Sequence, residues 1–212
     1  MNKFFNIISI LLGVILTVVL TYPINNNNHQ YFNFIEYEDS DCKTPTGAAY
    51  SGVANTCYDY DNQLPFNFLF KQTSDDIVQF NIFKSECYDT VDNSTDYQVD
   101  ICTPTNTNDY SYYKLSISNS IIQALSNSLV VTFQNGSGGN QETVGQAYFS
   151  QNYSINSVNA SDGIYIYSCE GKTPYLEMCA PSLLDNSDEP CYSFMLKPTV
   201  INDLSINIKC IN

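Results

Sequence analysis

Four carboxylates lie within the six residues EYEDSD, directly after an aromatic run and before Cys42. They are Glu36, Glu38, Asp39 and Asp41. Such residues could bind Ca²⁺, which takes about six to eight oxygen ligands, or supply the acid pair of a glycoside hydrolase. The EF-hand pattern is absent, however, and in a chain with 22 acids no single pair is informative. We therefore interpret Glu36–Asp41 as a solvated acidic turn and expect no metal site.

Nucleophilic catalysis needs an imidazole held against a serine or cysteine. The chain has one histidine, His29, which follows the polar tract Asn25–Asn28. We interpret it as an incidental surface residue. No C-x-x-C pair is present to form a zinc site. The sequence thus predicts no catalytic residue and no cofactor, and a hydrolase that uses carboxylates alone is a minor alternative.

An even number of cysteines in a secreted chain indicates disulfides. The eight cysteines are Cys42, Cys57, Cys87, Cys102, Cys169, Cys179, Cys191 and Cys210. We expect four bonds, so that no thiol is free to act as a nucleophile. A repeated 15-residue step raises the possibility of local pairs, Cys42 with Cys57 and Cys87 with Cys102. The residues inside the two steps are dissimilar, and the connectivity stays open.

The N-terminus has the features of a secretory signal peptide. Lys3 supplies a positive charge, and the apolar run Ile7–Leu20 is too short to span a bilayer. We expect residues 1–21 to be removed and the protein to be extracellular, the alternative being a retained membrane anchor. Residues 22–29 are predicted to form a flexible asparagine-rich lead-in, and residues 30–212 one domain.

The chain is strongly acidic, with a net charge of −14 and no arginine. Removal of residues 1–21 removes one lysine and no acid, which makes the charge −15. Nucleic-acid binding requires a basic surface and is therefore excluded as an expectation. We expect an extracellular protein or a cell surface as partner, and the sequence leaves the oligomeric state open.

Strand-like runs rich in Tyr, Phe, Ile and Val recur along the chain, separated by clusters of turn-forming residues. The predicted strands are 30–37, 65–70, 77–83, 112–117, 129–133, 144–150, 163–168, 192–196 and 204–209. Turns are predicted at 44–47, 92–96, 135–140 and 185–190. One short helix is predicted at Asn119–Ser128, where apolar residues have helical spacing. This pattern predicts an all-β, disulfide-bonded sandwich or barrel-like domain.

Four Asn-x-Ser/Thr sequences are candidates for N-glycosylation in a secreted chain. Their asparagines are Asn93, Asn135, Asn152 and Asn159. Because a glycan needs an accessible acceptor, we expect these positions to lie on exposed loops.

The layout of the chain is similar to that of a known group. An aromatic and acidic strand ends in cysteine (FIEYEDSDC), GIYIYSCEG follows late in the chain, and a cysteine lies near the end (IKCIN). With the asparagine-rich, arginine-free composition, this resembles the small secreted cysteine-containing proteins of social amoebae, which include the counting factor-associated proteins. The resemblance implies an extracellular protein associated with a secreted complex that regulates the size of multicellular aggregates. It supplies no site residues.

We conclude from the sequence that the chain is a secreted, non-enzymatic glycoprotein that acts through contact with proteins or cell surfaces. The alternative is a secreted, lectin-like carbohydrate-binding module that uses surface tyrosines and asparagines. Binding to glycans would distinguish the two.

Overall fold

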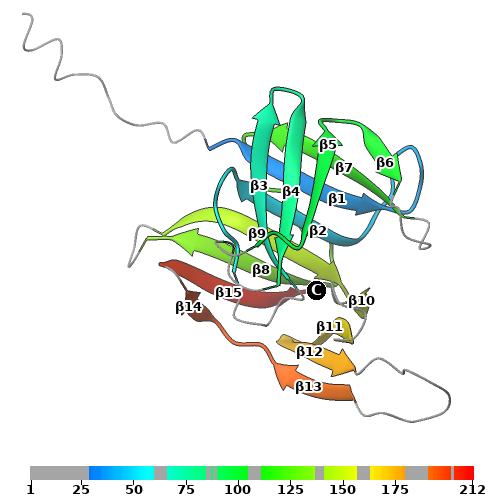
Figure 1. Ribbon diagram of the computed structural model, residues 1–212. Helices are drawn as coiled ribbons and strands as arrows, with labels where there is room; N and C mark the ends of the chain where they lie inside the picture. Colours follow the sequence, from blue (N-terminus) through cyan, green and yellow to red (C-terminus); the bar gives the residue numbers. More distant parts are fainter. Residues whose placement is uncertain are drawn as a thin grey trace, which may run out of the picture.

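The computed structural model describes residues 29–59, 66–84, 87, 90–104, 111–136, 141–156, 163–179, 191–201 and 203–212 (Figure 1). The predicted signal peptide, most of the predicted lead-in and Asn159 lie outside the described residues. These strands are β1 (Tyr31–Tyr37), β2 (Pro45–Val53), β3 (Asn67–Ser74), β4 (Ile77–Phe83), β5 (Asn93–Gln98), β6 (Cys102–Pro104), β7 (Tyr112–Ser118), β8 (Ser128–Asn135), β9 (Glu142–Ser150), β10 (Tyr153–Asn156), β11 (Ile164–Glu170), β12 (Thr173–Cys179), β13 (Cys191–Met195), β14 (Thr199–Ile201) and β15 (Leu204–Ile211). In this part of the chain no helix forms, and so none that could cross a membrane.

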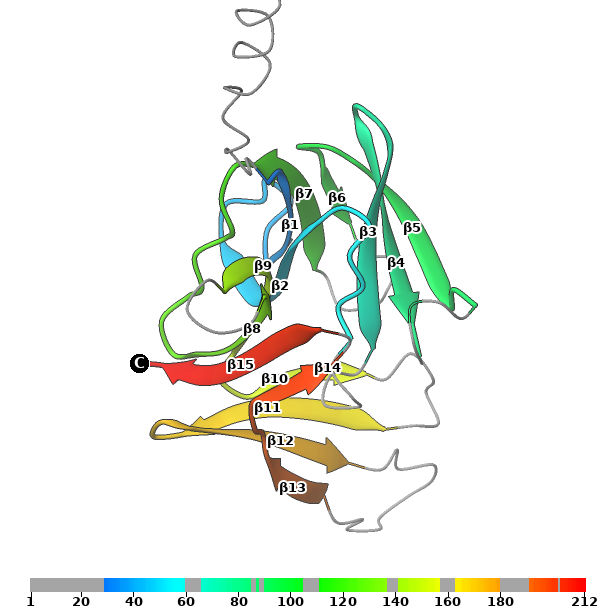
Figure 2. The ribbon, with the colours of Figure 1, turned by 90° about the vertical axis from the view of Figure 1, so that its left-hand side faces the viewer.

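The strands form three antiparallel sheets. The large sheet has the order β14-β15-β8-β9-β2-β1-β7-β6, and the two small sheets have the orders β10-β11-β12-β13 and β3-β4-β5. The three-stranded sheet faces β2 and β7, whereas the four-stranded sheet packs against β8, β9 and β15 (Figure 2). The expected all-β, sandwich-like fold is confirmed. The large sheet ends in separate edge strands, so it is not a closed barrel.

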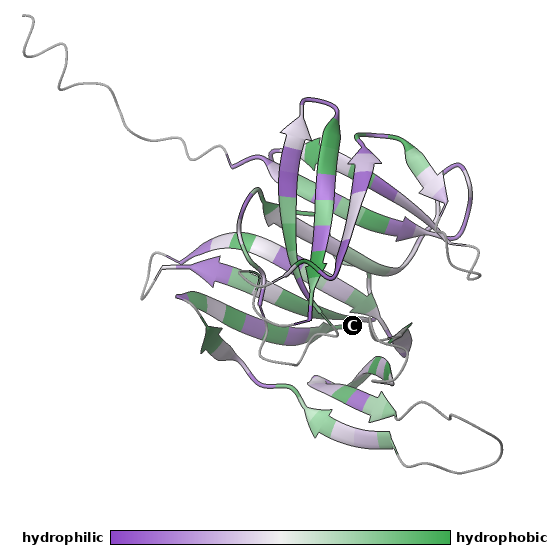
Figure 3. Cartoon of the chain, in the orientation of Figure 1, coloured by the Kyte–Doolittle hydropathy of each residue, from purple (hydrophilic) through white to green (hydrophobic). Residues whose placement is uncertain are grey.

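The face of the large sheet that packs against the small sheets, here called the inner face, carries the hydrophobic core. Two rows of directly paired residues cross its six central strands. One row is Ile206, Phe133, Gly145, Gly52, Phe32 and Ile117, and the other is Ile208, Val131, Ala147, Tyr50, Phe34 and Leu115. Because successive residues of a strand point to opposite faces, apolar and polar residues alternate along these strands (Figure 3).

A pair of glycines makes room for a buried tyrosine in the first of these rows. Gly52 and Gly145 lie opposite each other on β2 and β9. A Cβ atom at either position would come within 2.5 Å or 2.2 Å, respectively, of the Tyr58 ring. The ring is fully buried, and its hydroxyl donates to the Val144 carbonyl at 2.7 Å and accepts from the Val53 amide at 2.8 Å. The glycines are therefore required by close packing.

The predicted helix at Asn119–Ser128 is wrong. Residues 119–127, here called the covering segment, have no regular structure and lie over the opposite, outer face of the large sheet. The Ser118 hydroxyl donates to the Ser120 carbonyl and accepts from the Ser120 amide, which competes with helix formation. Asn127 has a positive φ of 57° and Ser128 begins β8. The apolar residues with helical spacing therefore belong to two different elements, the covering segment and the first residues of β8.

Four disulfides use all eight cysteines, as their even number predicted. The bonds are Cys42–Cys102, Cys57–Cys87, Cys169–Cys210 and Cys179–Cys191. The local pairs suggested by the repeated 15-residue step are wrong. The first two bonds are nested instead, because Cys42 follows β1 and Cys102 lies on β6, and both strands flank β7.

The longest strand that the sequence analysis missed is β2, a central strand of nine residues. Its sequence, PTGAAYSGV, is rich in small residues and starts inside the predicted turn at 44–47. The predicted turn at 92–96 is also wrong, since Asn93–Gln98 forms the edge strand β5. Both strands have low intrinsic β-propensity and are fixed by their neighbours in the sheets.

Candidate functional site

The acidic stretch divides into one buried acid and a turn. Asp39 accepts hydrogen bonds from the backbone amides of Asp41, Lys43 and Thr44, at 2.7–3.2 Å. These amides, chiefly that of Thr44, lower the pKa of the Asp39 carboxyl. Asp41 forms an exposed ion pair with Lys43 at 2.9 Å. The side chains of this turn therefore organise the chain before β2. Within the described residues no group of three or more histidines, cysteines or acids could hold a metal ion.

The sequence analysis placed Glu36 in an exposed acidic turn, and this placement is wrong. Glu36 lies at a bulge, where three residues of β2 stand opposite this one residue of β1, and it is only 7% exposed. Its Oε2 atom accepts hydrogen bonds from the Tyr153 hydroxyl at 2.7 Å and from the Ala48 amide at 3.2 Å. Gly47, with φ of 62°, leaves the space in which the carboxylate and the Tyr153 ring meet.

This acid stands among tyrosines. Burial raises the pKa of Tyr153, and Tyr113, Tyr50 and the Glu36 carboxylate raise it further. Burial likewise raises the pKa of Tyr50 well above its ordinary value. A buried carboxylate held by a tyrosine hydroxyl and a backbone amide is a structural arrangement that joins the large sheet to β10.

His29 lies against Glu142 of β9, with its Nε2 atom 3.1 Å from Oε1, and its ring makes an edge contact with Tyr31. The cysteines are all in disulfides, so none can serve as a nucleophile for this imidazole. The structure gives His29 a contact that joins the start of β1 to β9.

Three of the predicted glycosylation positions are described, and all three are exposed. Asn93 begins β5, Asn135 ends β8, and Asn152 lies in the turn between β9 and β10 with φ of 60°. Asn152 thus lies in a turn, as expected, whereas Asn93 and Asn135 are exposed end residues of strands and not loop residues.

The outer face of the large sheet carries a hollow that no sequence motif indicated. One row of directly paired residues on this face is polar on all six central strands. It consists of Asn207, Thr132, Gln146, Ser51, Asn33 and Ser116. The covering segment lies over Asn33, whose Nδ2 atom donates to Ser118 Oγ and the Ser120 carbonyl. The other end of the row, on β9, β8 and β15, is open.

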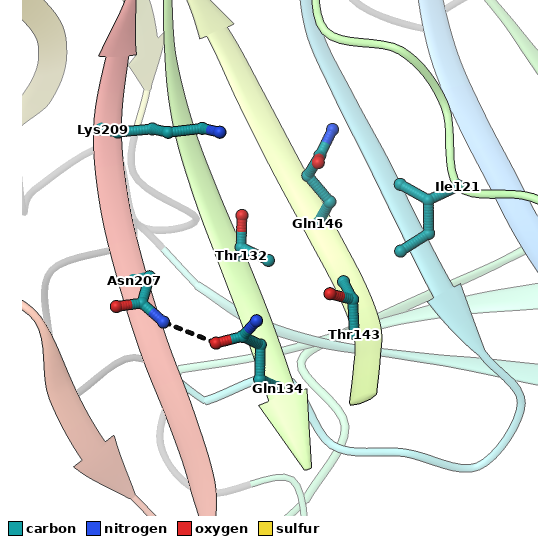
Figure 4. A pocket seen from close by; sticks show the side chains of 7 residues that line it. All are labelled: Ile121, Thr132, Gln134, Thr143, Gln146, Asn207 and Lys209. Atoms are coloured by element: carbon teal, nitrogen blue, oxygen red, sulfur yellow. Dashed lines mark hydrogen bonds between the residues drawn. The ribbon is translucent and has the colours of Figure 1, made fainter. Parts of the chain in front are cut away.

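This open end is a concavity of about 520 Å³, here called the polar trough (Figure 4). Its lining residues are Ile121, Thr132, Gln134, Thr143, Gln146, Asn207 and Lys209. Asn207 Nδ2 donates to Gln134 Oε1 at 2.7 Å, and Gln146 Nε2 donates to the Ile122 carbonyl at 3.1 Å. Hydrogen bonds thus hold the amide side chains of Asn207, Gln134 and Gln146 in place.

A second unusual surface is the edge strand β13, whose five residues are all exposed. Tyr192, Phe194 and Met195 are 62%, 50% and 53% exposed. Phe194 ends an apolar row that crosses the four-stranded sheet. The row is Tyr153, Tyr167, Leu176 and Phe194. Because Tyr167 and Leu176 are buried, the hydrophobic core continues along this row to an exposed edge.

A family model described as counting factor-associated protein A/B/C matches residues 2–212. The chain belongs to this family. No curated protein and no solved structure matches it. The resemblance found in the sequence is thereby confirmed, and it extends over nearly the whole chain.

Two of the segments that carry the family resemblance meet in the structure. GIYIYSCEG contains β11 and IKCIN ends β15, and the Cys169–Cys210 bond joins them. The third, FIEYEDSDC, contributes the buried Glu36 and the Cys42–Cys102 bond. In this member of the counting factor-associated proteins, two of these contacts, Glu36–Tyr153 and Cys169–Cys210, join the large sheet to the four-stranded sheet.

Proposed function

We propose that this protein is a secreted, non-enzymatic glycoprotein that associates with the counting factor complex and acts in the regulation of multicellular aggregate size. Its membership of the counting factor-associated family carries the proposal. Four disulfides support an extracellular site, where such bonds persist. The N-terminal signal sequence and the exposed asparagines Asn93, Asn135 and Asn152 support passage through the secretory pathway.

The contact with the complex is assigned to the β13 edge. Sheet edges with exposed apolar side chains pair readily with another strand, and proteins normally protect them with charge or a covering element. No residue of β13 carries a charge, although the whole chain has a net charge of −14. The long-range repulsion between two such acidic chains disfavours pairing with a second copy. The occupant is therefore an extended strand of a partner subunit in the complex.

The geometry of the edge specifies how that strand would bind. Leu196 donates its amide to the Pro174 carbonyl, so hydrogen-bonded pairing with β12 recurs at Phe194 and Tyr192. The backbone groups of Ser193 and Met195 point away from β12. A partner strand would hydrogen-bond to the N–H and C=O groups of Ser193 and Met195. It would also cover Phe194, which extends the buried row formed by Tyr167 and Leu176. This mode of recognition is strand addition to a sheet edge.

Co-fractionation of the secreted protein with the complex tests the proposal. We expect tagged protein in conditioned medium to elute with the complex on size exclusion, and the variant Tyr192→Ser/Phe194→Ser to elute alone. Ile101→Ser is the matched control, because Ile101 is also exposed (48%) but lies outside the β13 edge. Retention of the β13 variant in the complex would contradict the assigned contact. A wild-type protein that elutes alone would contradict association, and one that elutes as a dimer of itself would identify a second copy as occupant.

Mass spectrometry of the non-reduced, secreted protein tests the remaining parts of the proposal. We expect a new N-terminus after residue 21, four disulfides and glycan on the exposed sequons. A protein retained in cells with residues 1–21 intact would contradict secretion.

A further inference from the structure

We propose that the polar trough on the outer face of the large sheet is a binding site for an oligosaccharide. This activity is separate from association with the counting factor complex, because the trough and the β13 edge belong to different sheets. The proposal rests on the lining side chains, on their orientation and on what leaves this part of the sheet open.

The trough is open because the covering segment lies over the Val130 end of β8 and leaves Thr132 and Gln134 farther along that strand uncovered. Ile122, Ala124 and Leu125 of that segment pack on an apolar cluster formed by Ala49, Val130 and Tyr148. Ile121 forms one wall of the trough. Beyond it, the next strands present Thr132, Asn207 and Lys209 to solvent (Figure 4). The hollow is therefore bounded by a fixed wall on one side and by strands on its floor.

The lining has the chemistry of a hydroxyl-binding surface. Amide side chains offer both donors and acceptors, as do the hydroxyls of Thr132 and Thr143. Sugar hydroxyls likewise donate and accept at once, so each can satisfy two such groups. Six of the seven lining residues have polar side chains, and Ile121 is the exception.

The amides are also held in place, which lowers the entropy lost on binding. Gln134 and Asn207 are fixed by their mutual hydrogen bond, and this bond leaves Gln134 Nε2 and Asn207 Oδ1 for a ligand. Gln146 is fixed by its bond to the covering segment and keeps its Oε1 atom. A polypeptide strand could not pair with this floor, because β8 and β9 lie inside the sheet with both edges occupied.

Lys209 gives the trough a positive charge in an acidic protein. No carboxylate lines the trough, and within the described residues Lys209 forms no ion pair. Its ammonium group would attract an acidic substituent of a bound sugar. Neutral and acidic oligosaccharides therefore share the floor of the site, and only the acidic ones depend on the charge.

Glycan-array binding with the full secreted protein tests the proposal. The array carries neutral, uronic-acid-containing and sulfated oligosaccharides, and the same assay is run with EDTA. We expect binding to at least one of these classes that survives EDTA, because the lining lacks the carboxylates of a calcium site. The variant Gln134→Leu/Asn207→Leu should weaken binding at least tenfold. Gln79→Leu, on the three-stranded sheet, is the matched control and should bind as wild type.

Substitution of Lys209 distinguishes the binding of acidic oligosaccharides from that of neutral ones. Lys209→Met should weaken acidic oligosaccharides and leave neutral ones bound, whereas Lys172→Met, which removes the same charge in the β11–β12 turn, should change neither. Since a variant could lose binding by misfolding, amide chemical shifts of the wild-type protein provide a second readout. Ligand-induced shifts should map to β8, β9 and β15. Binding to no oligosaccharide, loss of binding in EDTA, or shifts confined to another surface would overturn the proposal.

Discussion

The Tyr153 hydroxyl donates a 2.7 Å hydrogen bond to Glu36 Oε2, and this bond joins the first strand of the large sheet to the four-stranded sheet. Because the acid is buried, its removal from water must be offset by such bonds. Gly47 provides the space that allows both groups to meet.

Tyr153→Phe is expected to lower the free energy of unfolding by about 1–3 kcal/mol, because the buried carboxylate then loses a donor. Urea unfolding followed by circular dichroism measures the change. In the background Glu36→Gln, where no buried charge needs the donor, the same substitution should cost less. Equal costs in the two backgrounds would show that the hydrogen bond to the carboxylate contributes nothing.

The buried tyrosines predict loss of stability at alkaline pH. Burial raises the pKa of Tyr148 to about 12 and raises those of Tyr50, Tyr58 and Tyr153 as well. In the unfolded chain tyrosine ionises at about pH 10. Above that pH the unfolded state loses protons that the folded state keeps, so stability falls as the pH rises from about 10.

Tyrosinate absorbance followed together with circular dichroism checks this expectation. The most buried tyrosines should ionise only as the protein unfolds, in one cooperative step. Ionisation of all 17 tyrosines while the fold stays intact would contradict it.

Gly145→Ala is expected to destabilise the protein by about 1–3 kcal/mol, because the added methyl group overlaps the Tyr58 ring in a packed core. Thermal unfolding measures the loss. In a Tyr58→Leu background the added methyl group should cost much less, so the two substitutions should couple strongly in a double-mutant cycle. Additive effects would mean that the ring does not occupy the glycine pair.

Removal of the Cys42–Cys102 bond should cost more stability than removal of Cys179–Cys191. The bonds span 60 and 12 residues, and the chain-entropy difference between such loops is about 1.4 kcal/mol. Paired Cys→Ala substitutions and chemical unfolding give the comparison. A larger loss for Cys179–Cys191 would show that local strand geometry, not loop entropy, dominates.

The sequence predicted strands well where side chains alternate and packing does not need small residues. Ile77–Phe83 has the predicted bounds of β4, and the run that forms β1 was placed to within one residue. The strand prediction failed for β2, because glycines and alanines are poor strand formers in isolation. Their value lies in the room they leave for Tyr58 and Tyr153, which belong to distant parts of the chain.

The trough could not be predicted for a related reason. Asn207, Thr132 and Gln146 lie on three strands that become neighbours only when β15 pairs with β8. Alternation along each strand indicated that these residues would share faces with other polar residues, but not that they would form one row. Glu36 was misplaced because it was grouped with the acids that follow it, although the alternation of β1 puts it on the inner face with Phe32 and Phe34.

The position of β15 inside the large sheet also affects the order in which strands can pair during synthesis. Gln134 and its partner Asn207 are 73 residues apart, and ribosomes add about 5–20 residues per second, so roughly 4–15 s separate their synthesis. For that interval β8 has no partner on one side and ends the growing sheet, with Val131 and Phe133 not yet covered by Ile206 and Ile208. We therefore expect the newly made chain to be open to mispairing at β8, which later forms part of the floor of the trough.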